Sequence, residues 1–260
     1  MVFILLPLFF VTWLSFFRQE IPSFPPDGYS LRWYSLIWSN AKFTDGFLLS
    51  LQIAIGATIF GLVLGVPAAL CIARFRFLGR EPLNNLLLLP LDVPGIVLGT
   101  AIYVFHVELQ ILIGRIEALA DYDINILGSL GALIAAHVLL VIPWSVRLVS
   151  ASLAGFDRSI EEAALSLGAT PITAFFRITL PVIRPGIVAA GLFGFVVSFG
   201  NLEMTLFLVG AGRTTLPIAI LQYLEWKIDP TIAAVSVLQI LLIGTAMFVT
   251  DRFVKLSRVV

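Results

Sequence analysis

Two carboxylates lie in long apolar stretches of this sequence, where acidic residues are rare and often functional. Asp92 stands in the run L-P-L-D-V-P-G, and Glu203 follows the run S-F-G-N. Apolar stretches of this length are candidates to span a membrane. A carboxylate in the middle of a membrane costs about 2.5–3.5 kcal/mol even on a lenient insertion scale, so it needs a cation, a hydrogen-bond network or water as its partner. We expect a polar translocation path lined by Asp92, Ser198, Asn201 and Glu203. The alternative is that each accepts hydrogen bonds from neighbouring helices only.

The other reactive side chains show no enzyme site. His106 and His137 have no cysteine or carboxylate cluster at metal-ligand spacing, and no serine stands in a nucleophile-elbow motif. The phosphate-binding pattern G-x-x-x-x-G-K-[ST] is absent, so we do not expect this chain to hydrolyse ATP. Cys71 is the one cysteine, which excludes an intrachain disulfide. We therefore expect no catalytic residue, no metal site and no cofactor bound by this chain.

A polar helix-turn-helix between two apolar stretches has the spacing of a docking loop. Asp157 or Ser159 can cap its first helix, Glu161 and Glu162 sit where the helix dipole favours carboxylates, and Gly168 can supply the left-handed stop. Alanines at the centre of one face would let another protein's backbone approach closely. That apolar face comprises Ile160, Ala163, Ala164 and Leu167.

A second short helix follows this loop. Thr170 and Pro171 are its expected cap and first residue, and Pro181 and Pro185 are expected to end it. Together the two helices carry the pattern E-A-A-x3-G-x9-I-x-L-P, which begins at Glu162. The pattern is similar at every named position to the signature loop of the membrane-spanning permease subunits of binding-protein-dependent ATP-binding-cassette (ABC) importers.

Two other runs resemble the spermidine/putrescine-type branch of that family. They are S-F-P-P-x-G-Y-S-x-R-W-Y at 23–34 and G-A-G-R-T-T-L-P at 210–217. The resemblance implies a type I importer permease fold, with a cytoplasmic loop at about 151–185 and a coupling helix near 158–170 that sits in a groove of an ATPase subunit. The coupling residues it implies are Glu161, Glu162, Ala163, Ala164, Leu167, Gly168, Ile178, Leu180 and Pro181.

The resemblance also implies partners. They are a second and different permease chain, two cytoplasmic ATPases that hold ATP and Mg, and an extracytoplasmic solute-binding protein. Carboxylates in the path point to a cationic or zwitterionic solute, either a polyamine or an amino-acid derivative. The alternatives are an ion-coupled secondary transporter or channel, which predicts an inverted repeat that we do not find in the sequence, and a structural membrane scaffold.

Composition places the chain in a bilayer. Hydrophobic residues make up 59% and charged residues 12%, and the sixteen basic and sixteen acidic residues cancel, so nothing indicates nucleic acid. A helix needs about 20 apolar residues to span the hydrocarbon core. We predict an all-α polytopic protein, one transmembrane domain over 1–260 with six spans near 1–17, 46–72, 83–105, 126–147, 186–208 and 231–250. In the second span Ala57, Gly61, Gly65 and Ala69 form a packing face.

The basic residues between these spans predict the orientation. Placing both termini in the cytoplasm leaves six outside, namely Arg18, Arg32, Lys42, Arg115, Arg213 and Lys227. Ten then lie inside, namely Arg74, Arg76, Arg80, Arg147, Arg158, Arg177, Arg184, Arg252, Lys255 and Arg258. The bias agrees with the positive-inside rule. We therefore expect a multi-pass protein of the bacterial inner membrane whose docking loop faces the cytoplasm.

Overall fold

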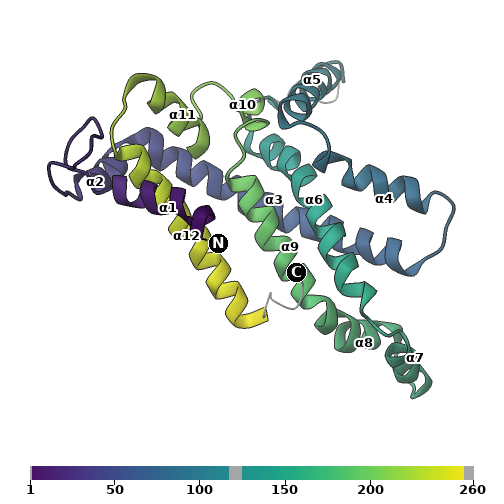
Figure 1. Cartoon of the computed structure of the whole chain (residues 1–260). Helices are drawn as coiled ribbons and strands as arrows, with labels where there is room; N and C mark the ends of the chain where they lie inside the picture. Colours follow the sequence, from purple (N-terminus) through teal and green to yellow (C-terminus); the bar gives the residue numbers. More distant parts are fainter. Residues whose placement is uncertain (1, 117–124, 255–260) are drawn as a thin grey trace.

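The computed structural model describes residues 2–116 and 125–254 and is built of helices (Figure 1). Its one β pairing within those residues is an isolated bridge between Phe17 and Tyr29. The all-α prediction is confirmed. Five of the described helices are long and apolar enough to cross a membrane: α3 (Ala41–Arg74), α5 (Gly95–Gly114), α6 (Leu130–Ala154), the helix Pro171–Phe199 that ends as α9 (Leu180–Phe199), and α12 (Thr231–Val254).

The predicted spans 46–72, 126–147 and 231–250 correspond to α3, α6 and α12. The predicted first span, 1–17, is the shorter helix α1 (Val2–Leu14), which packs against α12. Lys255 and Arg258, which entered the orientation argument, lie outside the described residues.

Helices α3, α6 and α9 lie side by side and form the centre of the bundle (Figure 1). A Cβ added at Gly61 would come within 2.5 Å of Cβ and Cγ1 of Val141 on α6, and one added at Gly65 would overlap Ser145. Glycine therefore lets the two backbones approach closely, as small residues do in membrane bundles. The predicted packing face is confirmed, because all four of its members are buried: Ala57, Gly61, Gly65 and Ala69.

The third predicted span, 83–105, has the wrong bounds. The chain forms α4 (Arg80–Leu88), a 3₁₀ turn η1 (Leu89–Leu91) and an extended residue at Pro94 before α5 begins at Gly95. Proline lacks the N–H that continues a helix, and it disfavours helical backbone at the preceding residue. Asp92 therefore lies between two helices rather than inside one.

The fifth predicted span, 186–208, differs at both ends. Its helix begins at Pro171 and stops at Phe199, and a turn then leads into the short helix α10 (Thr205–Leu208). The side chain of Asn201 accepts a hydrogen bond from the Thr205 N–H at 3.2 Å. This bond lies at the start of α10, whereas α9 itself ends with Gly200 as its C-cap, a residue type that is unfavourable inside helices.

The two ends of the bundle carry different short helices (Figure 1). At one end α2 (Arg32–Ser39) and α11 (Leu216–Trp226) pack on the start of α3, where the Leu216 N–H donates to Ser50 Oγ at 2.9 Å. At the other end α7 (Ser159–Ser166) and α8 (Pro171–Ala174) lie beyond the ends of α3 and α6. The predicted docking loop is therefore at one pole of the molecule.

Candidate functional site

The start of α7 has a side-chain hydrogen bond, although Arg158, its N-cap residue, makes no side-chain cap. Asp157 Oδ1 accepts the Ser159 N–H at 2.9 Å, so of the two predicted caps Asp157 makes a bond to the helix start, from one position before the N-cap. This hydrogen bond holds the pKa of the exposed Asp157 carboxyl below its ordinary value. Glu161 and Glu162 occupy the first turn, as predicted, where the exposed N–H groups of the helix favour negative charge.

Helix α7 ends at the predicted glycine. Gly168 has φ +88°, which is the left-handed region, and a Cβ added there would meet nothing within 4 Å. The Gly168 N–H donates to the carbonyl of Leu165 and the Ala169 N–H to that of Ala164, both at 3.0 Å. This pair of bonds is the Schellman motif, which satisfies the last carbonyls of a helix. Glycine is required here by backbone conformation and not by lack of space.

The outer face of α7 is open. None of its residues is buried, and Glu162 and Ala163 are exposed while Ala164 is half-buried. Leu167, just beyond the helix, is 89% exposed, and Ile160 is 53% exposed. Apolar side chains presented outside the membrane-spanning helices are typical of a surface that another protein covers. The predicted face is thus exposed rather than packed onto this chain, apart from the half-buried Ala164.

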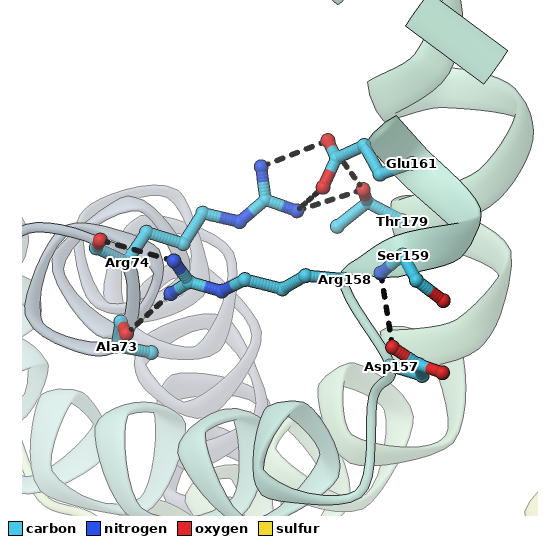
Figure 2. A network of polar contacts seen from close by, with 7 residues as sticks. All are labelled: Ala73, Arg74, Asp157, Arg158, Ser159, Glu161 and Thr179. Atoms are coloured by element: carbon cyan, nitrogen blue, oxygen red, sulfur yellow. Dashed lines mark hydrogen bonds and ion pairs between the residues drawn. The ribbon is translucent and has the colours of Figure 1, made fainter. Parts of the chain in front are cut away.

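Glu161 has a different environment from its neighbour Glu162. Its carboxylate accepts from both terminal nitrogens of Arg74, at 3.0 and 2.8 Å, and from Thr179 Oγ1 at 3.2 Å (Figure 2). Arg158 turns the other way and donates to the carbonyl of Ala73 at 2.8 Å. Sequence reasoning missed these partners, because Arg74 is 87 positions from Glu161 and no local pattern joins them.

The second half of the loop corrects one expectation. Thr170 caps α8 by accepting the Thr173 N–H at 3.2 Å, with Pro171 as first residue, so this start is confirmed. The helix does not end at Pro181 or Pro185. It continues through a π-helical turn, η3 (Phe175–Thr179), directly into α9. In this wider turn the Leu180 N–H donates to the carbonyl of Phe175, five residues earlier. The backbone hydrogen bonds of the helix are therefore already shifted by one residue where Pro181, which has no N–H, follows.

Three of the predicted coupling residues belong to this continuous helix. Ile178 is half-buried, and Leu180 packs on a core cluster with Ala69 and Ile183. Pro181 is exposed. The motif residues that follow Gly168 therefore join the docking loop to the bundle rather than extend the open face of α7.

Two of the predicted path residues lie in a polar network inside the bundle. Ser198 Oγ is 2.8 Å from His137 Nδ1, and Thr205 Oγ1 is 3.1 Å from His137 Nε2. Asn201 closes the network through Thr205, whose hydroxyl lies 3.0 Å from the Asn201 side-chain oxygen. Ser198, His137 and Thr205 are buried. His137 is a member that sequence reasoning missed, since an isolated histidine in an apolar stretch gives no signal.

The two predicted path carboxylates lie near one break in the helices. Asp92 is exposed in the turn before α5. Glu203 is also exposed, and its side chain lies against Gly95, the first residue of α5, so closely that an added Cβ would overlap its carboxylate. The partial positive charge of a helix start favours a carboxylate at this position. Within the described residues, no group of three or more His, Cys, Asp or Glu side chains forms a metal site.

The chain is similar to known transport proteins. It is 33% identical over 223 residues to the putrescine transport system permease protein PotI of Escherichia coli K12, covering 85% of this chain and 76% of that protein. It is 34% identical over 221 residues to the molybdenum transport system permease protein ModB of Mycobacterium bovis, covering 84% and 81%.

A structural comparison gives the same fold. A crystal structure of a bacterial ABC transporter involved in alginate import matches 98% of this chain and 90% of its own, with a TM-score of 0.73 at 16% identity. The family model described as "binding-protein-dependent transport system inner membrane component" matches residues 61–258. The chain therefore belongs to that family of importer permeases.

Proposed function

We propose that helix α7 docks a cytoplasmic ATPase and that the chain imports a small cationic or zwitterionic organic solute. The open face of α7 is the observation that carries the docking. It presents Ile160 and Leu167 beyond the membrane-spanning helices, on a helix that begins with a hydrogen bond to Asp157 and stops at Gly168. A rigid exposed helix is suited to enter a groove of another protein.

The assembly in this proposal has further members. A second, different permease chain completes the path, two ATPases bind ATP and Mg, and an extracytoplasmic binding protein delivers the solute. This chain itself binds no cofactor. Both termini and the α7 pole face the cytoplasm, which the arginines at 74, 76 and 80 support under the positive-inside rule.

A polyamine or an amino-acid derivative is the proposed solute class. Likeness to a putrescine permease supports it, together with the exposed carboxylates of Asp92 and Glu203 at the break before α5. Because a permease named for molybdenum is equally similar, identity to relatives does not choose the solute. The choice rests on the charge of these two residues.

The experiment uses the assembled transporter. The chain is purified from its own host together with the products of its neighbouring genes and reconstituted in proteoliposomes, and solute-stimulated ATP hydrolysis is measured with putrescine and with molybdate. Leu167→Asp should abolish stimulation, because it places a charge where an apolar contact is proposed. Leu78→Asp is the matched control, since Leu78 is fully exposed in the 75–79 connection near the same pole.

Two results would contradict the proposal. If Leu167→Asp left stimulation unchanged, or if both aspartate variants lost it equally, α7 would not be the specific docking element. Stimulation by molybdate and not by putrescine would overturn the solute class while leaving the docking role intact.

A further inference from the structure

Helix α7 is tied to a helix that is remote from it in sequence. Along the chain α7 connects only to α6 and α8, and Gly155 and Gly168 stand at these two connections. Its contacts with α3 are made by side chains and are drawn in Figure 2. We call this set the coupling clamp, and it consists of Arg74, Arg158, Glu161 and Thr179.

The clamp joins the first turn of α7 to the last turn of α3 in both directions. Arg74, the last residue of α3, reaches the carboxylate of Glu161 with two parallel bonds of 3.0 and 2.8 Å. Arg158, which precedes α7, reaches back to the carbonyl of Ala73 at 2.8 Å (Figure 2). The guanidinium of Arg158 thus binds a carbonyl at the C-terminal end of α3, where carbonyls lack partners within the helix. The carboxylate of Glu161 likewise lies in the first turn of α7, where the helix favours negative charge.

Thr179 extends the clamp to a third helix. It lies in the π-helical turn that leads into α9, is fully buried, and its Oγ1 is 2.8 Å from Arg74 Nη2. The side chains of Arg74 and Glu161 are only 23% and 16% exposed. A bidentate pair shielded in this way is stronger and more specific in direction than an ion pair in open solvent.

We propose that Arg74, Arg158 and Thr179 are positioning residues for transport, a role that rests on the proposed ATPase docking. They fix the orientation of α7 on the end of α3, so that a displacement of α7 by the ATPase moves α3 as well as α6 and α9. Gly61 and Gly65 pack α3 closely on α6, so a displacement that α3 receives at its end is passed on to the centre of the bundle. Without the clamp, α7 still contacts α8 and η3, but its displacement no longer acts directly on the end of α3.

The test exchanges the charges of the pair. Arg74→Glu and Glu161→Arg are made singly and together in the full transporter, and the readout is putrescine imported per ATP hydrolysed, counted per assembled complex. Each single variant should lower this ratio by about twofold to thirtyfold, the range for residues that carry coupling between sites. The double variant should recover a large part of the loss, because it restores an ion pair with reversed polarity.

Two further variants keep the test decisive if the charge variants fail to assemble. Thr179→Val keeps the volume of a fully buried side chain and removes its hydroxyl, so it should lower the same ratio without loss of yield. Arg76→Gln is the matched control, since Arg76 is an exposed arginine two positions from Arg74, and it should leave the ratio unchanged.

The outcomes separate this proposal from the docking proposal. ATPase retained on the complex with a lowered transport ratio supports the clamp. Retained ATPase with an unchanged ratio in Arg74→Glu or Thr179→Val overturns the clamp and leaves the docking proposal standing. Failure of the charge exchange to recover the loss also overturns it. A wild-type complex that carries no ATPase overturns the docking proposal itself.

Discussion

Val141 on α6 lies at the meeting point of three helices, and two glycines make room for it. A Cβ added at Gly61 on α3 would stand 2.5 Å from both Cβ and Cγ1 of Val141. A Cβ added at Gly194 on α9 would stand 2.6 Å from Cγ1 but 3.3 Å from Cβ. Both additions therefore meet Cγ1, but only the one at Gly61 also overlaps Cβ, and this difference gives a specific test of the packing.

The expected cost follows from these distances. Carbon atoms rest about 3.5–4.0 Å apart, so Gly61→Ala and Gly194→Ala each require a movement of about 1 Å. Overpacking of this size costs about 1–3 kcal/mol. Truncating Val141 to alanine removes both γ carbons and leaves Cβ in place. It should relieve the clash in Gly194→Ala, where the remaining contact is 3.3 Å, but not in Gly61→Ala, where it stays at 2.5 Å.

The assay is thermal unfolding of the purified complex in detergent. Since 1 kcal/mol corresponds to about 2–4 °C in a chain of this size, each glycine variant should lower the midpoint by about 2–12 °C. Gly244→Ala on α12 is the control, because an added Cβ there meets nothing within 4 Å. Equal rescue of both glycine variants by Val141→Ala, or an unchanged midpoint in Gly61→Ala, would refute the packing.

Four further outcomes are expected. Gly168→Ala should weaken solute-stimulated ATP hydrolysis, because a left-handed residue with a Cβ costs about 1–2 kcal/mol, and Gly168→Asn should do so less; equal effects would contradict the backbone argument. Glu203→Gln should lower uptake per detergent-stable complex but not solute binding to the isolated extracytoplasmic partner; normal uptake would remove Glu203 from the path. Thr205→Val should destabilise the complex by about 1–3 kcal/mol by leaving His137 without one partner, and an unaltered melting midpoint would argue against the buried network. With Cys71 replaced, a cysteine at Ser159 should react with an impermeant maleimide only in inside-out vesicles and one at Lys227 only from the opposite face; the reverse pattern would overturn the orientation.

Local rules made the docking loop predictable. The start of α8 after Thr170 and the stop at Gly168 each depend on residues within one or two helical turns, and both are confirmed. The orientation of Glu161 toward Arg74 was not predictable, because it depends on where two distant helices end. Sequence alone grouped Glu161 with Glu162, although the structure turns one inward and leaves the other exposed.

The bounds of the helices were least predictable where proline and glycine interrupt apolar runs. Hydropathy is continuous across Pro90 and Pro94, so the third span was placed too early. The opposite error occurred at Pro181, where a π-helical turn carries the helix through a residue that usually ends one. Whether a proline breaks or continues a helix was decided by the backbone around it, which the sequence pattern does not encode.

The central claim is that α7 meets an ATPase through its open face. Its most direct test places a photoreactive amino acid at Leu167, and separately at Arg76 as a control, and identifies the cross-linked protein in the intact transporter. The account predicts an adduct from Leu167 with a subunit that carries the G-x-x-x-x-G-K-[ST] motif, and none from Arg76. An adduct with that subunit from Arg76 alone, or an adduct from Leu167 only with lipid or with this chain, would contradict it.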